Sequence, residues 1–293
     1  MRKVMLAATQ MKCSQNEREN IAKAESNVQA AALKGANIIL LQELFSNIYF
    51  CQEVDYKYFE LAEPAENNPL IKRMSKLAKE LKVVIPVSFF EKCNEVYYNT
   101  VAVIDADGTV LGHYRKSHIP DDPGYYEKFY FTPGDTGFKV WDTKYAKIGV
   151  GICWDQWFPE AARCMALAGA EILLYPTAIG TEPADITEVC DKEIIADRWT
   201  RAMVGHSIDN MVPVVASNRT GIEEVGSTAI RFFGKSFITN AAGDIIASAG
   251  TDEECVILAE VDLDNYPKTR VLRFRDRRPD LYGSLLSKDG KVR

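Results

Sequence analysis

The polar and apolar positions of this chain form two recurring patterns. Short apolar runs, typical of buried strands, occur at residues 4–9, 38–41, 83–87, 172–175 and 212–216. Apolar residues spaced three or four positions apart, which indicate amphipathic helices, occur at residues 16–33, 69–81 and 160–168. Two apolar stretches interrupted by a turn with glycine, residues 99–115 and 236–247, predict β-hairpins. This alternation of strands and helices predicts an α/β fold.

The second half of the chain repeats the order of the first half. Residues 33–40 read LKGANIIL and residues 167–174 read LAGAEILL, an offset of 134 positions. The two predicted hairpins are offset by a similar 135 positions, from Gly108 to Gly243. We therefore expect one internally duplicated domain, an α-β-β-α sandwich with two sheets back to back and helices outside. The alternative is chance agreement between common strand–turn–helix patterns.

The alternation of apolar strands and amphipathic helices is no longer recognisable after about residue 261. Residues 270–278 contain five arginines, and Asp280-Leu281-Tyr282 follows them. We expect residues 1–263 to form the folded domain and residues 264–293 to form an extension that contacts another subunit, which predicts a homo-oligomer. A solvated tail is the alternative.

Composition excludes several functional classes. The chain has 293 residues and a net charge of −6, which does not favour a nucleic-acid partner and weakly fits a cationic small substrate. Seven cysteines, an odd number without a Cys-x-x-Cys motif, and only three histidines argue against a disulfide framework and against a metal site. We find no signal peptide and no stretch long enough to span a membrane, so a cytoplasmic protein without a membrane partner is expected.

Neither of two glycine-containing segments completes a cofactor motif. Gly234-Lys235-Ser236 resembles the end of a phosphate-binding loop, but position 229 is alanine where that loop needs glycine. Gly149-x-Gly151 lacks the third glycine of a dinucleotide fingerprint. No cofactor is therefore expected.

Cys153 follows the apolar segment Ile148–Ile152 and precedes a helix start at Pro159-Glu160. A thiol at the end of a buried strand, close to a helix N-terminus, occupies a favourable position for a nucleophile, because backbone N–H groups there stabilise thiolate. A buried structural cysteine is the alternative.

Three more charged residues follow predicted strands or lie in the loop between the two halves. Glu43 follows the run 38–41, Lys116 follows the predicted hairpin, and Glu127 lies in the loop after it. Each alone is typical of a surface position. Together with Cys153 they form a complete set for amide hydrolysis: Lys116 favours thiolate by its charge, and Glu43 accepts the thiol proton and later activates water. Lys116 and the backbone N–H of Trp154 are the expected oxyanion donors.

These segments resemble motifs of the nitrilase superfamily, carbon–nitrogen hydrolases with a Glu-Lys-Cys triad. The motifs are Gln42-Glu43-Leu44, Arg115-Lys116-Ser117-His118 and Gly151-Ile152-Cys153-Trp154-Asp155. The resemblance implies the α-β-β-α sandwich and assigns the triad to Glu43, Lys116 and Cys153. It also implies that Glu127 is the second glutamate of many members and fixes Lys116 and the substrate; a plain loop acid is the alternative.

Longer stretches resemble the branch of the superfamily that acts on N-carbamoylputrescine, an intermediate of polyamine synthesis. They include Tyr49-Phe50-Cys51-Gln52, residues 115–128, and Ala216-Ser217-Asn218-Arg219. The resemblance implies cleavage to putrescine, ammonia and carbon dioxide through a cysteine thioester. The alternatives are another amide or ureido substrate, as in β-ureidopropionase, or a non-catalytic scaffold that self-assembles.

The loop after the cysteine supports a cationic substrate. Members of the superfamily that bind a substrate carboxylate carry an arginine just after the cysteine, whereas residues 154–158 here contain none. Glu182, with Asp185 and Glu188 nearby, follows the run 172–175 and could pair with the distal ammonium; solvated acids are the alternative.

Four more residues are expected to line the substrate. Tyr49 and Trp154 could contact its methylene chain, unless they are core aromatics. Thr177 and Ala178 are expected at its carbamoyl end.

Overall fold

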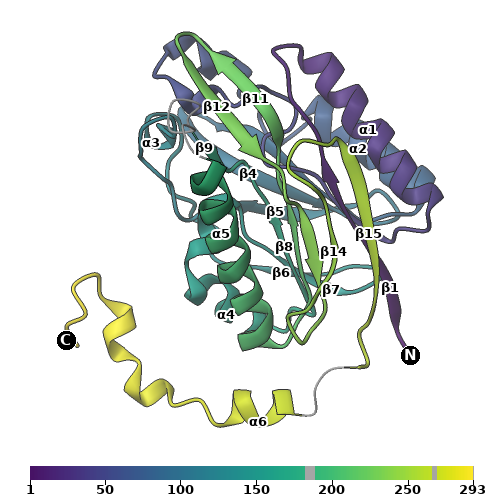
Figure 1. Ribbon diagram of the computed structural model, residues 1–293, viewed down its shortest axis with the longest axis vertical. Helices are drawn as coiled ribbons and strands as arrows, with labels where there is room; N and C mark the ends of the chain where they lie inside the picture. The colour runs from purple at the N-terminus through teal and green to yellow at the C-terminus, as the bar shows by residue number, and fades with distance from the viewer. Residues whose placement is uncertain (182–188, 266–268, 293) are drawn as a thin grey trace.

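The computed structural model describes residues 1–181, 189–265 and 269–292. Most of its strands build two sheets of similar strand order, and many of these strands can be followed in Figure 1. In the first sheet, β1 (Lys3–Gln10) pairs antiparallel with β15 (Cys255–Asp262) and parallel with β2 (Ile38–Leu40). A parallel bridge from Ile38 to Val84 continues this sheet into three antiparallel strands: β3 (Ile85–Cys93), β4 (Val96–Ile104) and β5 (Val110–Arg115).

The second sheet has the order β14-β13-β10-β8-β7-β6. Its strands are β6 (Val140–Asp142), β7 (Lys147–Val150), β8 (Ile172–Pro176), β10 (Val214–Ser217), β13 (Phe237–Thr239) and β14 (Ile245–Ser248). The pairs β7–β8 and β8–β10 are parallel, as β1–β2 and the β2–β3 bridge are in the first sheet. The two halves therefore share one topology, which supports the predicted duplication.

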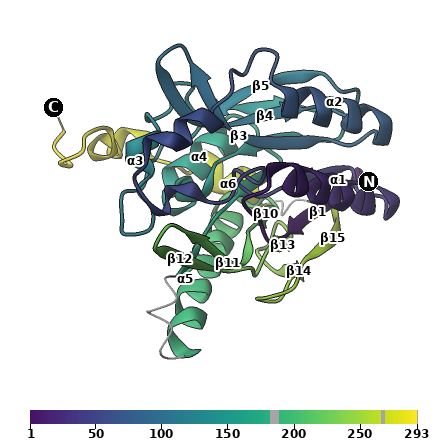
Figure 2. The ribbon, with the colours of Figure 1, turned by 90° about the horizontal axis from the view of Figure 1, so that it is seen from above.

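Helices cover the outer face of each sheet. The first sheet is covered by α1 (Glu17–Leu33) and α2 (Pro69–Leu81), and the second by α4 (Pro159–Leu167) and α5 (Val189–Asn210). Asn16 and Asn68 cap the N-termini of α1 and α2 with their side-chain oxygens, as expected for helix starts. Figure 2 shows α2 and α5 on opposite outer sides of the molecule, with the strands between them.

Three apolar layers hold this arrangement together. The central layer lies between the sheets and includes Leu6, Ile38, Val150, Ile172 and Leu174. The two outer layers lie between each sheet and its helices; Val28 and Met74 belong to one, and Met165, Trp199 and Met203 to the other. Burial of these side chains is the main favourable term in folding. The predicted α-β-β-α sandwich is confirmed.

The sequence-based expectation missed several elements, including β6, β15 and α5. It also missed a three-stranded sheet formed by β9 (Gly180–Thr181), β11 (Thr220–Val225) and β12 (Thr228–Phe233). Phe232 and Ile230 of β12 pack in a fourth apolar cluster with Tyr49, Phe50 and Ala178, so this small sheet covers the end of the sandwich where the predicted site residues lie.

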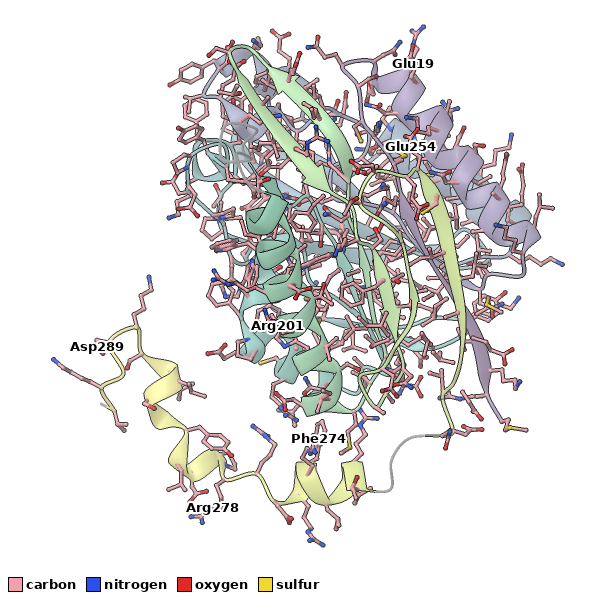
Figure 3. All side chains as sticks on the ribbon, in the orientation of Figure 1. Glu19, Arg201, Glu254, Phe274, Arg278 and Asp289 are labelled. Carbon is pink, nitrogen blue, oxygen red and sulfur yellow. The ribbon has the colours of Figure 1, made fainter. Side chains whose placement is uncertain are left out.

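The C-terminal segment lies along the outside of the body, below α4 and α5 in Figure 1. It contains α6 (Thr269–Arg275), from which Arg273 donates a hydrogen bond to the Ile208 carbonyl over 2.6 Å. The Arg163 guanidinium lies 4.9 Å from the centre of the Phe274 ring. Figure 3 shows Phe274 on the side of the segment that faces the body and Asp289 near its far end. None of the helices in the described residues is both long and apolar enough to cross a membrane.

Candidate active site

Glu43 lies three residues after the end of β2, and its side chain is fully buried. Its Oε1 accepts hydrogen bonds from Asn99 Nδ2 over 2.7 Å and from Lys116 Nζ over 2.8 Å. Among the described residues, Oε2 of the same carboxylate has no hydrogen-bond partner. One oxygen therefore fixes the carboxylate, and the other can accept a proton.

Lys116 follows β5 and is also fully buried. Its backbone N–H donates to the Asn99 carbonyl, and its carbonyl accepts from Gly134 N–H, each over 2.8 Å. Its Nζ lies 2.8 Å from Glu43 and 2.6 Å from Glu127. Burial alone disfavours the ammonium, but these two carboxylates raise the pKa of Lys116 well above its usual value. The cation therefore stays protonated.

Glu127 begins the short helix α3 (Glu127–Tyr130) and lies on the other side of Lys116. The Tyr49 hydroxyl donates to Glu127 Oε1 over 2.7 Å. Burial raises the pKa of Glu127 to about 7; the charge of Glu43 adds to this rise and Lys116 opposes it. The structure places Glu127 in the buried cluster, away from solvent, which disfavours the alternative of a plain loop acid.

Cys153 begins the 3₁₀ helix η3 (Cys153–Trp157) with a backbone φ of 41°. A positive φ is uncommon for a residue with a side chain, and such strain is characteristic of functional sites. Its Sγ lies 3.7 Å from the Ala178 carbonyl oxygen. Burial, and then the charge of Glu43, raise the pKa of Cys153 well above its usual value despite the opposing effect of Lys116. Lys116 therefore favours the thiolate by its charge, as expected, but burial and Glu43 outweigh it, so the thiol needs Glu43 as a base.

Asp155 holds the turn of the nucleophile, a role that the sequence reading did not assign. Its carboxylate accepts hydrogen bonds from Ile152 N–H over 2.8 Å and from the Tyr114 hydroxyl over 2.7 Å. It also accepts from His118 N–H over 3.0 Å and lies 2.7 Å from His118 Nδ1. Asp155 thus ties the segment before Cys153 to the loop that follows Lys116.

A buried ion pair supports the loop of Glu43, and it too was missed. Arg219 Nη1 donates to both oxygens of Glu223 over 2.8 Å, and its Nη2 donates to the carbonyls of Glu43 over 3.0 Å and Leu44 over 2.7 Å. Glu223 in turn accepts from Tyr49 N–H over 2.7 Å. The pair therefore fixes the loop after β2 at two points, Glu43–Leu44 and Tyr49. Arg219 belongs to the motif Ala216-Ser217-Asn218-Arg219, but its contact with the Glu43 carbonyl spans 176 positions of the sequence.

The predicted substrate-binding residues have different surroundings. Tyr49 is fully buried with its hydroxyl bound to Glu127, whereas Trp154 is half-buried next to Cys153. The Thr177 hydroxyl lies within hydrogen-bond distance of the Gln156 side-chain oxygen (3.2 Å) and of the Tyr175 carbonyl (3.1 Å). Ala178 presents its carbonyl to the thiol. Glu182, together with Asp185 and Glu188, lies outside the described residues.

The site combines a neutral thiol, a free carboxylate oxygen and a buried ammonium, the groups needed for covalent hydrolysis of an amide-type bond. In residues 1–181, 189–265 and 269–292, no three His, Cys, Asp or Glu side chains gather as a metal site. The geometry brings together Glu43, Lys116, Glu127 and Cys153, the four residues predicted to be catalytic.

Known proteins resemble this chain over nearly its whole length. Residues 5–271 match the family model described as carbon–nitrogen hydrolase. The chain is 58% identical to an N-carbamoylputrescine amidase of Solanum tuberosum, over 99% of this chain and 97% of that protein. It is 50% identical to a protein named citrullinase from Francisella tularensis subsp. tularensis, over 98% of this chain and 100% of the relative. A crystal structure of a carbon–nitrogen hydrolase from Helicobacter pylori G27 is similar, with a TM-score of 0.91 and 40% identity over 98% of this chain and 99% of that one.

Proposed function

Because this chain belongs to the carbon–nitrogen hydrolase family, and so acts on carbon–nitrogen bonds, we propose that its substrate is N-carbamoylputrescine. The strong similarity to N-carbamoylputrescine amidases over the full chain supports this substrate. The products are putrescine, ammonia and carbon dioxide, which gives the enzyme a role in polyamine synthesis.

In the proposed mechanism, Glu43 Oε2 takes the proton of the Cys153 thiol as sulfur attacks the ureido carbon. Lys116 Nζ and the Trp154 backbone N–H stabilise the oxygen that becomes negative. Ammonia leaves with the proton held by Glu43, and a carbamoyl thioester remains on Cys153. Glu43 then removes a proton from water, which attacks the thioester carbon. The thiol is regenerated, and the released carbamate loses carbon dioxide to give putrescine.

The observation that carries this mechanism is the asymmetry of the Glu43 carboxylate. Asn99 and Lys116 fix one of its oxygens, while the other is buried and has no partner among the described residues. An unpaired buried carboxylate oxygen is costly, and such exceptions occur where chemistry requires them. A purely structural carboxylate gains nothing from this arrangement, which weighs against a non-catalytic scaffold.

The charge of the site favours a cationic substrate. Two buried glutamates accompany one lysine, and the loop 154–158 offers no arginine for a substrate carboxylate. We propose that Trp154 borders the methylene chain, that Thr177 and Ala178 lie at the carbamoyl end, and that Glu182 pairs with the distal ammonium. Tyr49 acts mainly through its hydrogen bond to Glu127.

The test is ammonia release from a panel of N-carbamoylputrescine, citrulline and N-carbamoyl-β-alanine. We expect the highest kcat/KM for the diamine derivative and no turnover by Cys153→Ala. Cys164→Ala serves as a matched control because Cys164 is exposed and remote from the triad. Absence of turnover by the wild type, or full turnover by Cys153→Ala, would contradict the proposal. A Glu182→Gln variant that keeps the preference for the diamine would remove that residue as the anchor.

We also propose that residues 264–293 mediate contact between subunits of a homo-oligomer. Leu281, Leu285 and Leu286 of this segment are 65%, 63% and 91% exposed in the single chain, an unusual cost unless another surface covers them. Removal of residues 276–293 should reduce the mass measured by light scattering. A cytoplasmic location remains a prediction.

A further inference from the structure

The backbone that follows β8 passes directly beside the nucleophile. Strand β8 ends at Pro176, and the Ala178 carbonyl oxygen lies 3.7 Å from Cys153 Sγ. Residues 178 and 179 belong to no strand, so their peptide groups need other partners. The positions of these partners determine the direction of the Ala178 carbonyl.

Asn218 binds the peptide groups of Ile179 as a neighbouring strand would. Its Oδ1 accepts from Ile179 N–H, and its Nδ2 donates to the Ile179 carbonyl, each over 3.0 Å. The same amide accepts from Arg219 N–H over 2.9 Å and donates to the Gly234 carbonyl over 3.0 Å. Asn218 is fully buried, and with two donors at one end and two acceptors at the other, its amide has only one satisfied orientation.

Tyr125 binds the next residue in the same two-point manner. Its hydroxyl accepts from Gly180 N–H over 2.9 Å and donates to the Gly180 carbonyl over 3.0 Å. Burial of this hydroxyl raises the pKa of Tyr125, so it stays protonated and able to donate. On the other side, a Cβ at Gly180 would overlap the Arg231 backbone of β12, so the chain is in close contact there as well.

The Ala178 carbonyl is therefore fixed by two consecutive side-chain contacts just beyond it. At rest its partner is the Cys153 thiol. When the thiol proton passes to Glu43, this buried carbonyl loses its donor. A leaving –NH₂ group on the carbon under attack can replace that donor, whereas a leaving oxygen cannot.

We propose that Asn218 and Tyr125 are positioning residues that hold the Ala178 carbonyl as the acceptor for the leaving –NH₂ of the substrate. The inference rests on the proposed function and deepens it, because it predicts that this site selects a carbamoyl group over an ester of the same acid. A site built to bind an N–H rejects analogues that lack it, commonly by more than 10-fold.

The experiment compares two substrates that give the same thioester on Cys153. N-carbamoylputrescine releases ammonia, and N-(methoxycarbonyl)putrescine, its methyl carbamate analogue, releases methanol. Putrescine formation reports kcat/KM for both. The variants are Tyr125→Phe and Asn218→Asp, with Tyr126→Phe as the matched control, since no hydrogen bond of the Tyr126 hydroxyl helps to hold residues 178–180.

We expect both variants to lose about 10-fold or more of kcat/KM for the carbamoyl substrate but less than about 3-fold for the methyl carbamate. Tyr126→Phe should match the wild type on both. Modification of Cys153 by methyl methanethiosulfonate, followed by mass spectrometry, should change by less than about 3-fold, because that reagent has no –NH₂ group and the thiol loses only its weak 3.7 Å contact with the carbonyl.

Equal losses on both substrates, or a rate of thiol modification that falls as much as kcat/KM for the carbamoyl substrate, would indicate a general structural effect and overturn the inference. An unchanged substrate preference would overturn it as well. If Asn218→Asp does not fold, Tyr125→Phe decides alone. If the wild-type enzyme hydrolyses no carbamoylated diamine, the proposed function is contradicted instead. The inference is then tested separately: the variants are compared on an amide that the enzyme does hydrolyse and on the methyl ester of the corresponding acid.

Discussion

The Arg219–Glu223 pair offers the sharpest test of how the fold supports the site. Glu223→Gln keeps the size of the side chain but removes its charge. Glu223 accepts two hydrogen bonds of 2.8 Å from Arg219 and one of 2.7 Å from Tyr49 N–H. A glutamine must turn its –NH₂ group toward one of these donors, and a fully buried guanidinium loses its counter-charge.

The expected loss of stability follows from these contacts. Removal of one partner of a buried ion pair costs about 3–5 kcal/mol, because the remaining charge stays in a medium of low dielectric constant. For a chain of this size, about 2 °C of melting temperature corresponds to 1 kcal/mol, so the midpoint should fall by roughly 6–10 °C. Since Arg219 also holds the Glu43 carbonyl, kcat should fall by about 10- to 100-fold, with a smaller change in KM.

The assay is urea unfolding together with steady-state kinetics. Glu224→Gln is the matched control, because Glu224 is the next residue of β11 and points into solvent. It should change the free energy of unfolding by less than about 0.5 kcal/mol. If Glu223→Gln unfolds at the same urea concentration as Glu224→Gln, the pair does not stabilise the fold, and the reasoning fails.

Three further predictions concern the groups around Lys116. Burial raises the pKa of Glu127 to about 7, and only its ionised form pairs with the ammonium, so kcat/KM of the wild type should fall as the pH drops below about 7. Glu127→Gln should be slower at every pH and should lose this acidic fall in its pH–rate profile. A Glu127→Gln profile that still falls below about pH 7 would contradict the assignment. Tyr49→Phe removes the 2.7 Å hydrogen bond to Glu127 and should lower kcat about 10-fold in steady-state assays; an unchanged kcat would show that the bond is dispensable. Gly134→Ala places a methyl group against the Arg115 carbonyl, next to the hydrogen bond from Gly134 N–H to the Lys116 carbonyl. The free energy of unfolding measured in urea should fall by about 1–3 kcal/mol, and an unchanged value would show that the loop adapts without cost.

Much of the fold was readable because its signals are local. Asn68-Pro69 starts α2, and Lys82 ends it, as the spacing predicted. The apolar run at β8 has the length of a strand buried on both faces. Helix α5 carried a usable signal as well, since Ala196, Trp199 and Met203 are all buried and helically spaced; that spacing had not been recognised.

The hairpin of β11 and β12 could not be predicted by the same reasoning. In β11 the side chain of Ile222 is 46% exposed, whereas its neighbour Glu223 is only 2% exposed. A prediction that places apolar side chains in the interior and charged ones in solvent would bury Ile222 and expose Glu223, the opposite of what the structure has. The reason lies in Arg219, whose buried guanidinium requires a buried carboxylate. Such a requirement is set by tertiary contacts and leaves no periodic trace in the sequence.

The candidate site likewise has features that local sequence signals predict and features that depend on tertiary contacts. Glu43, Lys116 and Cys153 were identifiable because each follows a recognisable strand and lies in a motif. The rise in the pKa of the thiol was not, because it depends on the balance between burial, Glu43 and Lys116 in three dimensions. The supporting contacts of Asp155 and Asn218 likewise exist only once distant segments meet.

The neutral thiol also clarifies what Lys116 does. Its ammonium lies between two carboxylates and its charge balances them, so its pull toward a thiolate does not outweigh burial and Glu43. When Glu43 accepts the thiol proton, one of those carboxylates becomes neutral, and the same negative charge appears on the substrate oxygen. The net charge of the site is therefore unchanged, and Lys116 exchanges one anionic partner for another without new desolvation. With Glu127 ionised, the site keeps one excess negative charge throughout, which attracts the cationic end of a carbamoylated diamine and disfavours a substrate that carries a carboxylate.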